Sequence, residues 1–182
     1  MLETEVYQKV RLFVYEALLL AEPSFNINKN KIIIANQSDS RPVKPFVTIQ
    51  LSSFRDVGSP IRKAMLSVDN QDIQESLMSR LCTASVQVYS DKLQQAEDIA
   101  NHIYRYLYTE MVNNIFGGEL ALRRVLKTVT AIPTALNEQI ESRAFFDIEL
   151  GYITSVKYSV GWIKTVEVTN QINDQIYIIE RE

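Results

Sequence analysis

Residues 83–107, TASVQVYSDKLQQAEDIANHIYRYL, decide the fold because their hydrophobic period changes within one short polar turn. Before the turn, Ala84, Val86 and Val88 alternate with polar residues, as in a strand with one buried face. After it, apolar residues recur at helical spacing, with Asp91 as the expected N-cap. The stretch therefore predicts a half-buried strand leading directly into a long helix. The expected core stripe of that helix is Leu93, Ala96, Ala100, Ile103, Leu107 and Met111.

Strands are expected on both sides of this unit. The strand before the turn begins near residue 73, and Gly117-Gly118 is the stop signal of the helix. Residues 55–63 contain glycine and proline and are expected to form a loop, whereas 119–124 are ambiguous between helix and loop. The last two strands are expected to pair as a hairpin around Asn173-Asp174. The other expected strands span residues 31–35, 46–51, 125–132, 144–158, 162–168 and 176–179.

The chain begins with an amphipathic helix, expected over residues 3–21. Leu12, Tyr15 and Leu19 project from the side opposite its core stripe. They either pack under a loop or face a partner subunit that covers the helix from outside. The expected core stripe is Val6, Val10, Phe13, Val14, Ala17, Leu20 and Ala21.

Helix, strands, long helix and strands follow one another along the chain. Strands that come in runs, without alternating with helices, give an α+β architecture. We therefore expect a mainly antiparallel mixed β-sheet with two helices packed on it. At 182 residues, without internal repeats or a change of composition, the chain is expected to form one domain.

Composition excludes several function classes. A single cysteine, Cys82, and a single histidine, His102, cannot make a disulfide framework or a usual zinc site. Five glycines leave little material for phosphate-binding loops. The net charge of −3 argues against a protein that grips nucleic acid. No apolar run reaches membrane-spanning length, and the acidic N-terminus predicts an intracellular protein without a secretory signal.

Few residues could carry chemistry. His102 lies opposite the core stripe of its helix and is expected to face solvent or a neighbour. Asp147 and Glu149 share one strand face about 7 Å apart, as an acid/base pair or as the wet face of the strand. Tyr106 and Tyr108 lie off the core stripe, as interface residues or as ordinary surface.

Three stretches resemble neck or tail-terminator proteins of long-tailed bacteriophages. They are NQSDSRPVKPFVTIQL (36–51), the opening stretch 83–107, and RAFFDIELGYITSV (143–156). The resemblance rests on element order over residues 3–168, and Ser90 stands where the family usually turns at glycine. It implies a tail-terminator-like domain over 1–168, with 169–182 as a C-terminal strand or arm.

The resemblance implies a structural virion protein of the tail and neck, assembled in the host cytoplasm, without catalysis, cofactor, metal or membrane. Such proteins form a hexameric ring that caps the tail tube, stops its polymerisation and joins it to the head-completion or connector protein. In sheathed tails the ring also contacts the sheath, and DNA only passes through the lumen.

Candidate contact residues follow from that implied ring. Asp147 and Glu149 are the candidate lumen-facing acids. A head-completion or adaptor protein, a small hydrolase using Asp147, Glu149 or His102, and a nucleic-acid-binding module are the alternatives. The candidate subunit-interface residues are Leu12, Tyr15, Leu19, Arg55, Arg62, Lys63 and Tyr106.

Overall fold

The structure, a computed structural model, describes most of the chain; two short strands near its end, residues 165–170 and 175–180, and some other strand ends are described by their backbone alone. The helices are α1 (Glu3–Leu19), α2 (Leu93–Tyr106) and α3 (Glu110–Phe116), with a 3-10 turn at Lys29–Lys31. The strands are β1 (Ile32–Ile34), β2 (Phe46–Ala64), β3 (Asp72–Ser90), β4 (Leu120–Leu136), β5 (Gln139–Val160), β6 (Thr165–Asn170) and β7 (Gln175–Glu180). The described residues are 1–21, 25–35, 41–64, 72–136, 139–160, 165–170 and 175–180.

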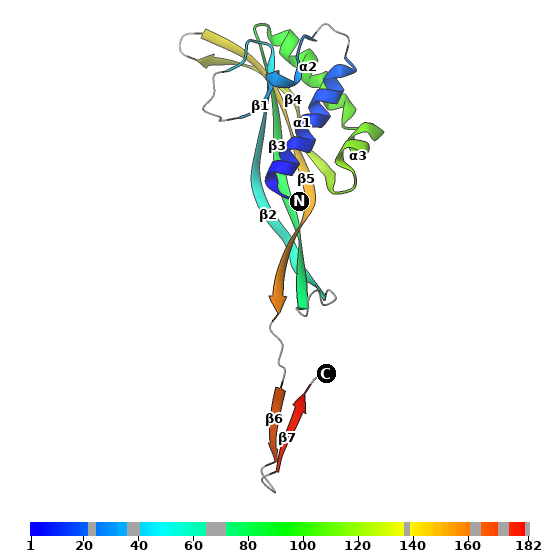
Figure 1. Cartoon of the computed structure of the whole chain (residues 1–182). Coiled ribbons are helices and arrows are strands. Elements are labelled where there is room, and N and C mark those ends of the chain that lie inside the picture. The colour runs from blue at the N-terminus through cyan, green and yellow to red at the C-terminus, as the bar shows by residue number, and fades with distance from the viewer. Residues whose placement is uncertain are drawn as a thin grey trace. The chain divides into compact units, whose positions relative to one another are not determined.

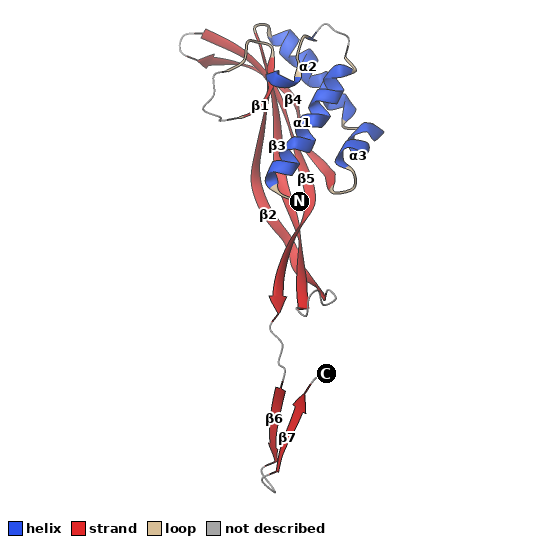
Figure 2. Ribbon diagram, viewed as in Figure 1, coloured by secondary structure: helices blue, strands red, loops and turns tan. Residues whose placement is uncertain are grey.

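One mixed sheet organises the main part of the molecule. Its five strands lie in the order β1-β2-β3-β5-β4, with β1 parallel to β2 and β4 antiparallel to β5. The three helices lie on one side of this sheet (Figures 1 and 2). This confirms the predicted α+β class with a mixed sheet, although the structure has three helices where two were expected.

The chain divides into two compact units. The first comprises Met1–Ser59 and Met78–Thr154, and it holds the helices and the core. The second comprises Pro60–Leu77 and Ser155–Glu182, and it contains a separate two-stranded sheet in which β6 runs antiparallel to β7. The hairpin predicted for the last two strands is therefore confirmed. The domain boundary at residue 168 stays a prediction.

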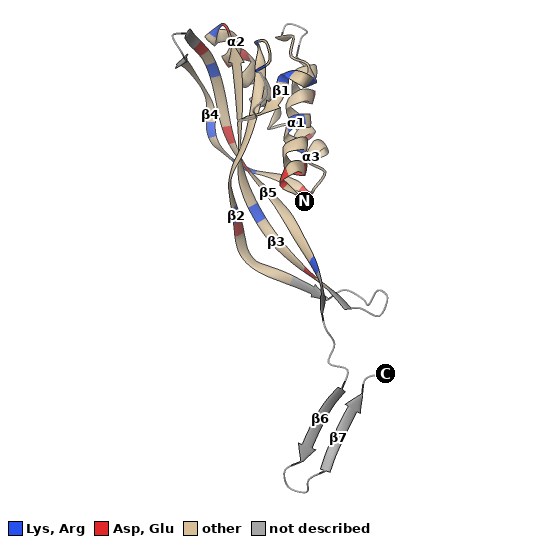
Figure 3. Ribbon diagram, turned by 60° about the vertical axis from the view of Figure 1, so that its left-hand side comes forward, with Lys and Arg blue, Asp and Glu red and all other residues tan. Residues whose placement is uncertain are grey.

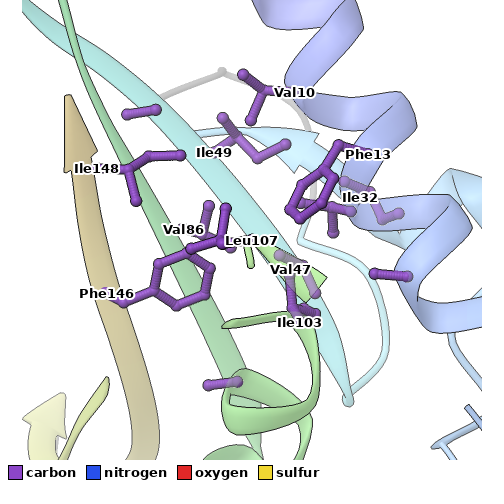
Figure 4. Close-up of a cluster of buried hydrophobic side chains, with 14 of the residues drawn as sticks. Val10, Phe13, Ile32, Val47, Ile49, Val86, Ile103, Leu107, Phe146 and Ile148 are labelled. Carbon is purple, nitrogen blue, oxygen red and sulfur yellow. The ribbon is translucent and has the colours of Figure 1, made fainter. Parts of the chain in front are cut away.

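The core of the first unit lies between the helices and the sheet (Figure 4). Burial alternates along part of each central strand, so that every second residue is buried from Cys82 to Ser90 of β3 and from Ser142 to Tyr152 of β5. Phe13 of α1 packs near Phe116 of α3, with ring centroids 6.0 Å apart. Phe146 of β5 meets the Tyr104 ring of α2 at 5.6 Å. These aromatic contacts join all three helices and the sheet into one apolar layer.

Helix α1 buries a slightly different stripe from the predicted one. Val6, Val10, Phe13, Val14 and Ala17 are buried as expected. The helix ends at Leu19, two residues before the predicted end, and Leu20 is 61% exposed.

Leu18 is buried in its place, so the expectation of buried residues at 20 and 21 is wrong. The early end of the helix removes the last turn that would have carried those positions inward.

The second predicted helix is broken into α2 and α3. Around Leu107 the backbone hydrogen bonds shorten to three residues, and the Thr109 hydroxyl donates to the Tyr106 carbonyl at 2.8 Å. A side chain that takes up a backbone carbonyl competes with the helix, which explains the break. Gly117 has a positive φ of 62° and ends α3, as predicted from its freedom to adopt the left-handed conformation.

The predicted N-cap, Asp91, is wrong. The backbone N–H of Lys92 donates instead to the Ser90 hydroxyl at 3.4 Å, and Lys92 occupies the N-cap position without a side-chain hydrogen bond. Asp91 is exposed and lies 3.9 Å from the Lys44 ammonium. The Asp91 carboxylate therefore lies near Lys44 and does not cap α2.

The predicted loop at 55–63 is also wrong, because β2 continues through it to Ala64. Two residues of β2 depart from regular strand geometry: Gly58 and Ser53 have positive φ angles of 78° and 54°. The pairing of β1 on β2 ends at Ile49, so Pro60 lies in a part of β2 without a β1 neighbour, and an open strand edge tolerates proline.

The edge strand β4 is also longer than predicted, with residues 120–136 instead of 125–132. It begins at Leu120, which resolves the ambiguous stretch 119–124, and it passes through Pro133, which pairs with Ser142. On β5 the buried face ends at Tyr152, and Val156 is 64% exposed.

Removing the Phe146 ring tests the central contact of the core. Phe146→Ala should lower the free energy of unfolding by about 3–5 kcal/mol, because the fully buried ring leaves a cavity against α2. Phe145→Ala, one residue earlier and only half-buried, is the matched control and should cost clearly less. Urea unfolding followed by circular dichroism measures both, and equal losses would contradict the assigned burial.

Candidate interaction surfaces

The two acids of β5 have different environments. Glu149 is only 8% exposed and sits between two arginines. Arg55 of β2 approaches its Oε2 atom at 2.7 Å, and Arg124 of β4 approaches Oε1 at 3.1 Å. Asp147 is half-buried and forms no ion pair within the described residues. The two acids predicted to share a strand face therefore differ. Arg55 and Arg124 hold Glu149, an arrangement called the Glu149 clamp below, whereas Asp147 has no ion pair among the described residues.

The clamp changes the protonation of Glu149. Burial raises the pKa of its carboxyl, but the hydrogen bonds and positive charges of Arg124 and Arg55 outweigh burial. The net result is a pKa below the ordinary value of 4.5. The clamp joins three strands, β2, β4 and β5, on the sheet surface that faces away from the core. Figure 3 shows the basic and acidic positions along these strands.

The outer side of α1 exposes apolar side chains. Leu12 is 39% exposed and Leu19 is 56% exposed, whereas Tyr15 is half-buried against the core. Beside the helix lies an open groove of about 990 Å³, to which Leu12 contributes. The groove also receives side chains from strands β2, β3 and β5, among them Val57, Leu81 and Ile153.

We call this groove the α1 groove. An ion pair joins two of the residues that line it. The Lys9 ammonium lies 3.1 Å from the Glu119 carboxylate and donates to the Phe116 carbonyl at 3.0 Å, which ties α1 to the end of α3. At Gly151, a Cβ atom would come within 3.1 Å of the Arg123 side chain. The groove floor is therefore shaped for a residue without a side chain.

The remaining predicted contact residues do not gather at one place. Arg55 is bound in the Glu149 clamp. Tyr106 is half-buried and lies against His102, with ring centroids 5.1 Å apart. Arg62 and Lys63 lie in β2, and their side chains fall outside the described residues. The contact role of all of these residues stays a prediction.

The rare reactive residues have structural surroundings. The Nε2 atom of His102 lies 3.0 Å from the Ala17 carbonyl, and Phe25 packs on the ring at 5.6 Å, so the ring faces α1 and not solvent. Burial raises the pKa of the Cys82 thiol to about 11. Within the described residues, no cluster of His, Cys, Asp and Glu is arranged to hold a metal ion, and none of the described helices could span a bilayer.

Sequence reasoning missed the ion pairs because their partners are far apart in the chain. The Arg80 guanidinium of β3 lies 2.9 Å from the Asp56 carboxylate of β2 and 3.7 Å from the Glu3 carboxylate of α1. Arg55 and Glu149 are separated by 94 residues. The spacing of residues along the chain does not predict such pairs, because the strand order of the folded sheet brings the partners together.

A two-layer α+β domain with clamped charges and an exposed apolar helix face is typical of a structural protein that works by contact. The chain belongs to the phage neck terminator protein family, whose model matches residues 4–176 of 182. The resemblance seen in the sequence is thereby confirmed. No curated protein matches the sequence. The chain is thus a structural phage neck protein, located in the virion, whose family implies contacts with other head and tail proteins.

The Glu149 clamp predicts a pH-dependent stability. Because the folded pKa lies below the ordinary value, the clamp stabilises the fold above pH 4.5, and this contribution is lost as the pH falls through the folded pKa. Glu149→Gln should therefore be less stable than the wild type at pH 7, and the difference should shrink in acid. Urea unfolding at pH 7 and in acid measures the difference in stability between the variant and the wild type.

Asp147→Asn is the matched control, since Asp147 lies on the same strand without an ion pair among the described residues. Its difference from the wild type should stay small at both pH values. A Glu149→Gln variant whose deficit is constant with pH would contradict the clamp.

Proposed function

We propose that the chain forms a ring, a hexamer, at the head-proximal end of the phage tail. The ring caps the tail tube, stops its polymerisation and offers the surface to which the head connector joins. In a sheathed tail it also contacts the last sheath ring, and DNA passes through its lumen. The family membership and the exposed apolar side of α1 support this proposal.

A ring closes when two different patches on one subunit repeat a contact by a fixed rotation. In our proposal, the first patch is the outer side of α1, with Leu12, Tyr15 and Leu19, continued into the α1 groove. Exposed leucines beside a groove with charged walls match the usual composition of an interface, apolar in the centre and polar at the rim. Tyr106, which lies against His102 of α2, is a separate proposed contact residue.

The second patch lies along β2 in this proposal, with Arg55, Arg62 and Lys63. Asp147 and Glu149 are proposed as lumen-facing acids, which would repel passing DNA. The clamp limits the part of Glu149, because two guanidinium groups offset its single charge. Asp147 would therefore supply most of the repulsion.

The C-terminal part is proposed as an arm to a neighbouring subunit or to the tube, attached to a domain over 1–168. In this part β6 and β7 pair antiparallel, from Thr165 opposite Glu180 to Asn170 opposite Gln175. A two-stranded sheet is only marginally stable alone in water, so contact with a neighbour would stabilise it. The proposed arm, residues 169–182, includes β7 and the end of β6.

A head-completion or adaptor role is the second candidate within the same class. The direct test is electron microscopy of the protein alone and mixed with its tail tube protein. Rings seated on tube ends support the terminator role. Binding to the head connector with no binding to the tube would favour the adaptor role.

A charge placed on the α1 patch should break the ring and leave the fold intact. Leu12→Asp is expected to weaken self-association at least about tenfold, because an unpaired charge buried in an interface costs more than about 1.4 kcal/mol. Analytical ultracentrifugation with the tube protein present measures the change. Val43→Asp, at a residue 81% exposed and outside the groove, should assemble like the wild type.

Removing residues 165–182 tests the arm. The shortened chain should keep the melting temperature of its core, because the buried cluster lies wholly within residues 6–152. Ring mass or tube capping should be reduced, as seen by native mass spectrometry and electron microscopy. An unchanged ring that still caps tubes would exclude the arm as a contact element.

A further inference from the structure

A second cavity lies on the sheet surface that faces away from the core. It measures about 290 Å³ and is lined by residues of β1, β2, β3 and β5 and of the segment before β2. Phe46 and Tyr89 form one wall, with their rings stacked at 4.8 Å and an interplanar angle of 12°. Thr48, Gln87 and Arg143 also line the cavity, which shares no residue with the α1 groove.

Two polar atoms at this cavity lack hydrogen-bond partners among the described residues. They are the Nε atom of Arg143 and the Oγ1 atom of Thr48, and both are buried. Thr48 as a whole is only 7% exposed. Buried donors without partners are rare in folded proteins because each forfeits its bond to water. Both residues line this cavity, and neither atom has an acceptor within the described residues.

Arg143 also lacks a carboxylate partner in the described part of the chain. Its NH1 atom donates to the Gln87 side-chain oxygen at 3.4 Å, and its guanidinium lies 5.2 Å from the Phe145 ring. By contrast, Arg41 at the cavity rim bonds Glu141 at 3.2 Å, and Arg55 and Arg124 share the Glu149 carboxylate.

We propose that this cavity receives the carboxylate of an acidic side chain from a neighbouring protein of the assembled neck. The planar guanidinium of Arg143 matches a carboxylate in shape and offsets its single charge. The Thr48 hydroxyl supplies a further donor, and the Phe46–Tyr89 wall excludes water from the pair. The proposal uses the family membership for the existence of a neighbour and is independent of ring formation.

A carboxylate fits this cavity better than a nucleic-acid phosphate. Phosphate binding by DNA-contacting proteins relies on several cations along a backbone, whereas one uncompensated guanidinium lines this cavity within the described residues. The net charge of −3 also disfavours DNA. A short acidic side chain, by contrast, needs one cation, one extra donor and a space of this size.

The first test uses the full chain and acetate as the probe. Arginine Nε–H signals are followed by ¹⁵N NMR while sodium acetate replaces sodium chloride at constant ionic strength, and Arg143→Lys assigns the signal. The Arg143 signal should shift and saturate with acetate, and Thr48→Val should weaken the effect about tenfold. The Arg124 signal, already engaged by Glu149, is the internal control and should stay constant. A shift that chloride reproduces, or none, would overturn the proposal.

The second test asks where the carboxylate comes from. Asp39 and Glu138 are acids of the chain itself that lie outside the described residues. Asp39→Asn and Glu138→Gln should leave the Arg143 signal of the free protein unchanged. A shift in either variant would assign the carboxylate to the chain itself and overturn the proposal.

The third test is assembly with variant protein. Arg143→Glu should lose head–tail joining by electron microscopy, whereas Arg105→Glu, an equal charge change on the exposed side of α2, should not. Arg143→Gln guards against misfolding, because it removes the charge and keeps much of the side chain. Joining that survives both Arg143 variants at wild-type melting temperature would refute the assigned contact.

Discussion

Burial of one face of the two central strands is the constraint on which the rest of this structure depends. From Cys82 to Ser90 of β3 and from Ser142 to Tyr152 of β5, every second side chain faces the helices and is buried. A shift of register by one residue would exchange the two faces completely. The apolar layer therefore fixes which side chains of β3 and β5 point to the opposite surface.

The opposite surface follows from that constraint. Strands β2, β4 and β5 bring charged residues there, and the sheet order places β2 and β4 on either side of the central pair. The Glu149 clamp uses all of this, since its arginines come from β2 and β4. Burying a carboxylate without partners would be costly, so the two guanidinium groups are required where Glu149 is only 8% exposed. Arg143 stands out on this surface because the same order brings it no carboxylate within the described residues.

The sequence predicts the elements better than their ends or their contacts. Alternation along β3 and β5 and helical spacing in α1 are local signals, and each is confirmed. Gly58 and Pro60 are equally local signals, yet β2 continues through them because pairing with β3 outweighs their turn preference. The break after Tyr106 depends on one threonine hydroxyl, which no periodicity registers.

Of the candidate surfaces, exposure of Leu12 and Leu19 was predictable from their angle on the helix. The cavity at Arg143 was not predictable, because its walls come from four strands and their spacing exists only in the folded sheet.

Separation of the α1 groove from the Arg143 cavity has a consequence for assembly. The two sites share no lining residue, so a ligand at one does not compete directly with a ligand at the other. Substitutions without shared partners usually act additively. A phage neck protein whose family implies contacts with other head and tail proteins must meet unlike neighbours at the same time. Two chemically different sites, one with exposed leucine and one with an uncompensated guanidinium, allow that without making either contact depend on the other.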